Sequence, residues 1–151
     1  MREVVTAISA KADDILEQAM RAVQAVGAAR FSALDALAAP LYATDTDVIT
    51  YFNPACIEFA GRMPRRGEDR WCVTWRLYTD DGEPLSHDAC PMAVALKEQR
   101  PIRGVTAVAE RPNGSRVSFM PLPTPLLNAA GEMIGAFNVL IDLTDASAQA
   151  V

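Results

Sequence analysis

Apolar residues in the first 26 positions recur at alternating spacings of three and four. This spacing keeps apolar side chains on one face of an α-helix, and no Gly or Pro interrupts the pattern before Gly27. The pattern therefore predicts a long amphipathic helix with one apolar seam. The seam residues are Val5, Ile8, Ala12, Ile15, Ala19, Ala22 and Val26.

This seam has two alternative uses. The helix can fold back on its own domain, or it can pair with the same helix of a second chain, as heptad seams do. Its alanines would let two helices approach closely but would bury little area per layer. Because the seam is long and separate from the domain behind it, we favour the second use and expect a homodimer.

Shorter elements follow as far as residue 61. Ser32 followed by Asp35 resembles a capping box, which predicts a short helix over residues 33–38. Asn53 followed by Pro54 predicts another helix start, with Asn53 as the N-cap and Pro54 in the first turn. The other elements expected here are strands at 41–44 and 48–52 and a helix at 54–60.

The second half of the chain changes to a period of two, which is typical of strands. Asn113-Gly114 suits a tight hairpin turn between two of them. Pro121, Pro123 and Pro125 cannot donate to a sheet ladder, so part of the middle strand should lie at an edge or a bulge. The expected elements are a helix at 91–99 and strands at 104–110, 116–122 and 133–142, whereas 62–86 should be loop, short helical turns and at most one strand.

These elements predict an α+β domain, with a five-stranded antiparallel sheet, short helices on one face and a long N-terminal helix before it. A length of 151 residues suits one such domain. We expect three parts: a helix at 1–31 for dimerisation or signalling, a domain at 32–145, and a C-terminal tail at 146–151.

Charge and composition exclude several classes of protein. A net charge of -5, from 19 acidic and 14 basic residues, argues against nucleic-acid binding. No apolar run is long enough to insert into a membrane, and three cysteines without a signal peptide fit the reducing cytoplasm. One basic cluster is expected to be a solvated loop rather than an anion or partner site: Arg62, Arg65, Arg66 and Arg70.

Four segments, in this order, resemble the PAS family of sensor domains. They are "LYATDTDVITYFNPACIEFAGR", "DGEPLSHDACPMAVAL", "ERPNGSRV" and "GAFNVLIDLTD", within residues 34–145. The last is similar to the exit through which PAS domains pass a signal into a following helix, which assigns that role to Asp142 and Thr144. The resemblance implies a sensory or regulatory module of bacterial signalling, with a partner such as a histidine kinase. It fits both a stand-alone domain and a part of a longer sensor.

The sequence offers little support for a bound metal, haem or flavin. Cys72, His87 and Cys90 include soft ligands, but a single His and no fourth ligand argue against a metal site. PAS sensors that bind haem use an axial His on the long helix, where this chain offers only Met92. The Asn-Cys-Arg motif of flavin-binding relatives is also missing. We therefore expect no metal, haem or flavin, and we expect no enzyme, since no phosphate loop, paired carboxylates or nucleophile elbow is present.

Asn138, in the last predicted strand, is expected to be a buried polar residue. Strand alternation places Ala136, Asn138 and Leu140 on one face, and the PAS resemblance turns this face toward the helices. Asn138 then either bonds to a backbone group or water in a filled core, or orients a small apolar ligand. The first alternative makes the chain a ligand-free interaction and dimerisation module. The residues expected to line a ligand cavity are Tyr42, Thr44, Trp75, Met92, Leu96, Phe119, Asn138 and Leu140.

Overall fold

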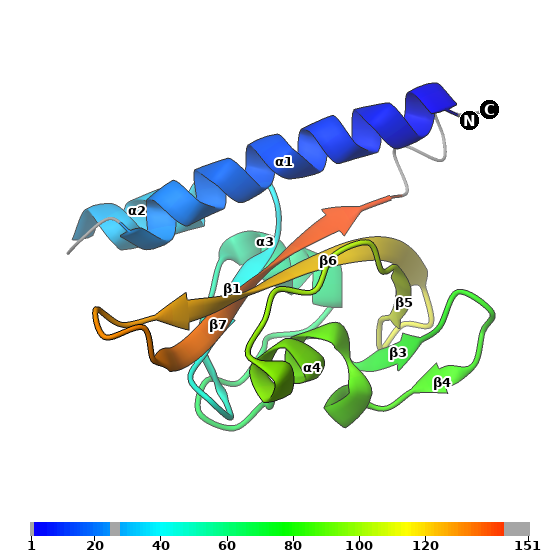
Figure 1. Ribbon diagram of the computed structural model, residues 1–151. Coiled ribbons are helices and arrows are strands. Elements are labelled where there is room, and N and C mark those ends of the chain that lie inside the picture. Colours follow the sequence, from blue (N-terminus) through cyan, green and yellow to red (C-terminus); the bar gives the residue numbers. More distant parts are fainter. Residues whose placement is uncertain (1, 25–27, 144–151) are drawn as a thin grey trace.

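Seven strands form one antiparallel sheet, rather than the five expected (Figure 1). The computed structural model describes residues 2–24 and 28–143, and only the backbone of residues 2–9, 28 and 30. The order across the sheet is β2-β1-β7-β6-β5-β3-β4. The strands are β1 (Leu41–Thr44), β2 (Ile49–Phe52), β3 (Arg76–Tyr78), β4 (Pro84–Leu85), β5 (Ala107–Glu110), β6 (Arg116–Leu127) and β7 (Met133–Asp142).

The two additional strands come from the stretch expected to be mostly loop. β3 pairs with β4 and, on its other side, with β5. Within β3 only Leu77 is buried, and β4 has two residues. Elements this short carry too little alternation to indicate strands, so the expectation of at most one strand in this stretch was wrong.

Helices cover both faces of the sheet, whereas short helices on one face were expected (Figure 1). α3 and α4 cover the inner face, with η1 packed beside α4, and α1 and α2 lie against the outer face. No helix in the described part of the chain is long and apolar enough to cross a lipid bilayer. The helices are α1 (Arg2–Gln24), α2 (Ala28–Asp35), α3 (Pro54–Ala60), the 3-10 helix η1 (His87–Ala89) and α4 (Pro91–Glu98).

Two helix starts differ from the local sequence signals. Ser32 lies inside α2, so the capping-box interpretation was wrong, and the domain boundary expected at residue 31 falls within this helix. Asn53 precedes α3 as expected, but its side chain makes no capping hydrogen bond. It instead accepts from the Leu41 N–H at 3.0 Å and donates to the carbonyls of Leu34 (3.1 Å) and Ala39 (2.9 Å). Asn53 therefore joins α2, the following linker and β1.

The prolines of β6 lie where the strand has one strand partner. β5 pairs with β6 only as far as Phe119. Beyond it, Pro121, Pro123 and Pro125 pair with β7 alone, and the Pro123 carbonyl accepts from the Ile102 N–H at 3.2 Å. The prediction that part of this strand lies at an edge is confirmed, although the strand runs to Leu127.

The seam of α1 lies against the outer face of the chain's own sheet. Ala12, Ala19 and Ala22 are buried in one cluster with Phe137 and Val139 of β7. Small alanines allow the helix to approach the strands closely. The first of the two uses of the seam is therefore present within one chain. The homodimer stays a prediction; of the other seam residues, Ile15 is partly buried, Val5 and Ile8 have no described side chains, and Val26 lies outside the described residues.

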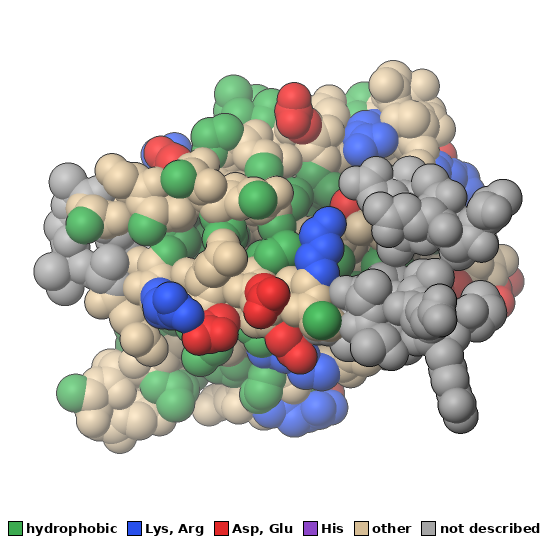
Figure 2. All heavy atoms as spheres, turned by 90° about the horizontal axis from the view of Figure 1, so that it is seen from above, with side chains coloured by type: hydrophobic (Ala, Val, Ile, Leu, Met, Phe, Trp, Pro, Cys, Tyr) green, Lys and Arg blue, Asp and Glu red, His purple; other side chains and the backbone are tan. Residues whose placement is uncertain are grey.

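The outward side of α1 is charged. Figure 2, which views the molecule from above Figure 1, shows acidic and basic side chains gathered over this helix. Glu17 and Arg21 form an ion pair there at 2.6 Å. Because both side chains are exposed, this pair contributes little to stability, and the alanine contacts hold α1 on the sheet.

We expect Ala19→Glu to release α1 while leaving the inner core folded. Ala19 is fully buried (0% exposed), and a carboxylate there would lose its hydration without gaining a partner. Amide hydrogen exchange of residues 10–24 should accelerate at least about tenfold, the effect of about 1.4 kcal/mol, while that of α4 stays unchanged. Ala10→Glu, at an exposed position of the same helix, is the control. Equal exchange in the two variants would contradict the packing described here.

Candidate functional site

Asn138 is buried on the inner face of β7, as strand alternation together with the PAS resemblance implied. Its side-chain nitrogen donates to the Tyr42 hydroxyl and its oxygen accepts from the Leu122 N–H, both at 3.0 Å. The Tyr42 hydroxyl donates to the Trp71 carbonyl at 2.5 Å. Burial raises the pKa of Tyr42 well above its ordinary value, so the hydroxyl keeps its proton and remains a donor. Protein groups therefore satisfy both ends of the Asn138 amide.

Five of the predicted cavity residues meet in the inner core and fill it. Tyr42, Met92, Leu96, Phe119 and Leu140 belong to one cluster in which each of them is at most 7% exposed. Four cavities of about 240–390 Å³ in the described part of the chain include none of Tyr42, Met92, Leu96 and Phe119 in their lining. The core between the sheet and α4 is thus occupied by side chains.

Trp75 and Thr44 lie apart from this group. Trp75 is 38% exposed and carries the Arg76 guanidinium 4.1 Å from its ring centroid, so the expectation that it faces the inner core was wrong. Thr44 is buried at the end of β1, and its hydroxyl has no hydrogen-bond partner among the described residues. It borders a cavity on the outer side, together with Phe31 and Ile134.

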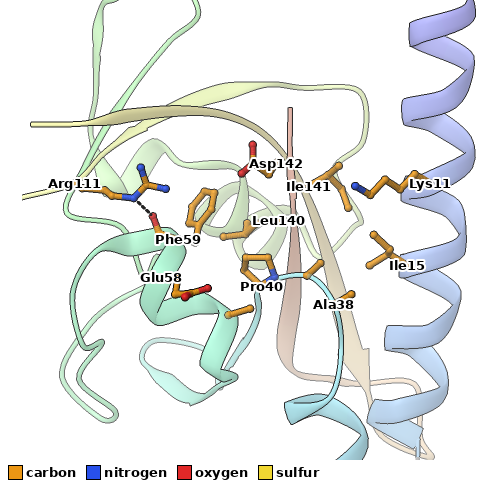
Figure 3. A pocket seen from close by; sticks show the side chains of 12 residues that line it. Lys11, Ile15, Ala38, Pro40, Glu58, Phe59, Arg111, Leu140, Ile141 and Asp142 are labelled. Atoms are coloured by element: carbon orange, nitrogen blue, oxygen red, sulfur yellow. Dashed lines mark hydrogen bonds between the residues drawn. The ribbon is translucent and has the colours of Figure 1, made fainter. Parts of the chain in front are cut away.

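A cavity of about 360 Å³ lies where α1, α3 and the end of β7 meet (Figure 3). β1 begins opposite Val139, so β7 continues beyond it, and there the Leu140 N–H donates to the Pro40 carbonyl at 2.9 Å. This junction cavity, as we term it, is lined mainly by Lys11, Ile15, Ala38, Pro40, Glu58, Phe59, Arg111, Leu140, Ile141 and Asp142.

Arg111 is fixed at the edge of the junction cavity by two hydrogen bonds. Its Nε donates to the Phe59 carbonyl at 2.9 Å, drawn as a dashed line in Figure 3, and its Nη1 donates to the Ser115 hydroxyl at 3.1 Å. Gly61 ends α3 with a φ of 66°, and a Cβ at this position would come within 3.0 Å of the Arg111 side chain. The glycine therefore lets the β5–β6 hairpin attach to α3.

The junction cavity combines an apolar floor with charges of both signs. Lys11 and Arg111 are cationic, and Glu58 and Asp142 are anionic. Lys11 comes from α1 and Asp142 from the end of β7, so a molecule that contacts both would link these two elements (Figure 3). Such a lining suits a small ligand with an apolar body and charged or polar ends.

This cavity unites residues that the sequence assigned to three different roles. Ile15 belongs to the helix seam, Leu140 to the predicted ligand set, and Asp142 to the signal exit. Thr144, the other exit residue, lies outside the described residues. Lys11, Glu58 and Arg111 were not predicted, because single charged residues on a helix face or near a turn form no pattern in the sequence.

The basic cluster is held by interactions within the chain rather than solvated throughout. Arg62 donates to the Val73 carbonyl at 3.0 Å and pairs with Asp69 at 2.8 Å, and Arg65 pairs with the same carboxylate. Burial raises the pKa of Asp69, but the Arg65 N–H and the Arg62 guanidinium outweigh it and lower that pKa below its ordinary value. Arg70 pairs with Asp47, and the Arg66 guanidinium lies over the Phe52 ring.

Cys72 neighbours Cys90, and it is linked to His87 through Thr74. The Thr74 hydroxyl lies 2.9 Å from the Cys72 sulfur and 3.4 Å from His87 Nε2. Within the described residues, no group of three or more His, Cys, Asp or Glu side chains could hold a metal ion.

No protein-family model matches the sequence, and a search of curated proteins finds no match. Solved structures do match the fold. The PAS domain from the fruit-fly ELK potassium channel has a TM-score of 0.58 at 12% identity, over 76% of this chain and 94% of that one. The chain has the PAS fold. The family resemblance of the four sequence segments is thereby confirmed at the level of fold.

Two bacterial LOV structures show the same PAS architecture. The Rhodobacter sphaeroides LOV protein matches with a TM-score of 0.56 at 14% identity, over 87% of this chain and 68% of that one. The LOV domain from a blue-light activated histidine kinase of Erythrobacter litoralis matches with a TM-score of 0.53 at 15% identity, over 71% and 97%. At identities this low, the structural similarity shows a shared fold alone.

Proposed function

We propose that this PAS domain is a non-enzymatic sensory or regulatory module of bacterial signal transduction, acting in the cytoplasm. The junction cavity is the observation that carries the proposal. Ile15 of α1, Leu140 and Asp142 share its wall, so occupancy would alter how α1 docks beside the end of β7. One structural neighbour comes from a histidine kinase, which supports a kinase as the partner that reads this change.

The ligand belongs in the junction cavity rather than in the inner core. A volume of about 360 Å³ is near the lower end of the range for small-molecule sites, roughly 300–1,000 Å³. The four charges around the apolar floor favour a small amphipathic molecule over the purely apolar ligand expected from the sequence. Lys11 and Arg111 would bind its anionic groups.

A specific observation also favours a second function. The inner core is filled and the Asn138 amide is satisfied, as expected of a ligand-free interaction module. In that case α1 would exchange its seam between its own sheet and a second chain, and the homodimer would be the signalling unit. The two functions differ in whether the junction cavity retains a molecule.

Native mass spectrometry of the purified, untagged protein tests both. We expect excess mass on each subunit, and we expect Ala38→Trp to abolish it, because Ala38 lines the junction cavity and an indole there would occupy the space. Ala129→Trp, in an exposed turn, is the control. Thermal unfolding should confirm that both variants fold.

Each result has a defined meaning. Excess mass that persists in Ala38→Trp would place the ligand elsewhere and contradict the role of the junction cavity. No excess mass in any sample would favour the interaction module. The same spectra report subunit number: a monomer at micromolar concentration would contradict the homodimer.

A further inference from the structure

Two thiols meet in the inner core although they lie far apart in the sequence. Cys72 and Cys90 are both free, they are buried in the same inner-core cluster, and each side chain shifts the pKa of the other, as only close neighbours do. Cys90 is at the N-cap of α4, where its sulfur accepts from the Ala93 N–H at 3.4 Å. The first turn of α4 thereby fixes one member of the pair.

Cys72 lines a small cavity. Cys72 is 7% exposed and lines a space of about 240 Å³, together with Arg62, Arg70, Trp75 and His87. A small oxidant can therefore contact this sulfur without unfolding the domain. Cys90 is buried and is not among the lining residues.

The surrounding groups shift the pKa values of the two thiols in opposite directions. The neighbouring Cys90 side chain and the Thr74 hydroxyl lower the pKa of Cys72 in spite of its burial, and the contact with Cys72 raises the pKa of Cys90. The thiolate is the nucleophilic form of cysteine. Because Cys72 also lines the cavity whereas Cys90 does not, Cys72 is the reactive member. Burial raises the pKa of Cys56 to about 12, and its thiol donates to the Leu41 carbonyl at 3.2 Å.

We propose that Cys72 is a peroxide-reactive thiol and that Cys90 is the partner that resolves it into a disulfide. The Cys72 sulfur attacks one oxygen of hydrogen peroxide; an S–O bond forms, the O–O bond breaks, and the departing hydroxide takes up a proton to become water. Cys72 is now a sulfenic acid. The sulfenic acid carries no thiolate charge, so the Cys72 contact no longer holds the proton on Cys90. The Cys90 sulfur loses this proton as it attacks the Cys72 sulfur; an S–S bond forms, and the S–O bond breaks. The hydroxide leaves as water with the Cys90 proton, so two thiols and one peroxide give one disulfide and two waters.

The disulfide would connect this chemistry to the centre of the sheet. It would tie the segment that contains β3, β4 and η1 to the first turn of α4. The neighbouring Trp71 has a φ of 60° and accepts the hydrogen bond from Tyr42, which contacts Asn138 of β7. Because Trp71 precedes Cys72 in the chain, a shift of Cys72 toward Cys90 acts directly on the hydrogen bond between Tyr42 and the Trp71 carbonyl. The proposal goes beyond the proposed function, since it does not require the junction cavity to bind a ligand.

Peptide mapping after peroxide treatment of the folded protein tests the proposal. Trypsin places the three cysteines in separate peptides, 31–62, 71–76 and 77–97. We expect a cross-linked pair of 71–76 with 77–97, a mass loss of about 2 Da per chain, and loss of the free Cys72 thiol at least about tenfold faster than that of Cys56. Cys90→Ser should stop the reaction at the sulfenic acid, which dimedone traps on peptide 71–76. Cys56→Ser is the matched control and should still form the disulfide.

The wild-type map alone can overturn the proposal, so no variant has to fold. A cross-link that includes peptide 31–62, equal rates for all three thiols, or no reaction short of unfolding would each contradict it. In denaturant the three thiols should react alike, which shows that the fold creates the difference. None of these results depends on the mass retained in the junction cavity, so the two proposals fail independently.

Discussion

Replacing Asn53 with Ala should lower the free energy of unfolding by at least about 3 kcal/mol. Asn53 is fully buried, and its amide is the hydrogen-bond partner of three backbone groups, on Leu34, Ala39 and Leu41. Removing the amide leaves these groups without that partner, at about 1–3 kcal/mol for each group left unsatisfied. The loss should detach α2 and the start of β1 from the inner core.

Urea unfolding curves measure this change, with Asn113→Ala as the matched control. Asn113 also makes two side-chain hydrogen bonds, at 2.9 and 2.7 Å to the N–H and hydroxyl of Ser115, but it is exposed in a hairpin turn. Water can replace these bonds, so we expect a loss below about 1 kcal/mol. Similar losses in the two variants would show that Asn53 does not join the two segments.

Gly135→Ala should be at least as damaging, with a loss of more than about 3 kcal/mol or no soluble protein. A Cβ on Gly135 would lie 2.1 Å from the Thr44 carbonyl oxygen and 3.1 Å from the Asp45 Cα. Both are backbone atoms, so the clash cannot be relieved by rotation of a side chain. β1 would have to separate from β7 at one end of their ladder.

Thermal unfolding and soluble yield measure the effect, and Gly67→Ala provides the control. Gly67 has no atom within 4 Å of an added Cβ, but its φ is 75°. Alanine there meets only the strain of a left-handed backbone, roughly 1–2 kcal/mol. A Gly135 variant as stable as the Gly67 variant would contradict the close approach of β1 and β7.

The sequence predicted those elements whose signals are local and long enough. β7 is a largely apolar run of ten residues, α4 begins at a proline, and Asn113-Gly114 forms the expected hairpin turn. α2 was misplaced because Ser32 and Asp35 match a capping box at a position where the helix is already formed. A local motif of two residues is outweighed by the burial of Leu34 beneath α1.

The site was less predictable because its residues meet through the tertiary fold. Alternation groups Asn138 with Ala136 and Leu140 on one face of β7, and the PAS resemblance implied that this face is the buried inner one. Neither indicates the junction cavity: Arg111 bonds to Phe59, 52 residues earlier in the chain, and Lys11 joins them only because α1 crosses the sheet. Similarly, nothing in the spacing of Cys72 and Cys90 indicates that they are neighbours in the inner core.

During synthesis, β1 cannot complete its pairing until β7 has been made, so this part of the sheet folds late. Tyr42 and Asn138 are separated by 96 residues, and β7 lies between β1 and the remainder of the sheet. At a translation rate of roughly 5–20 residues per second, the nascent chain waits about 5–20 s after β1 before this partner exists. Throughout that interval the alanine seam of α1 also lacks its sheet. The N-terminal third is therefore the part of the nascent chain most in need of chaperone protection.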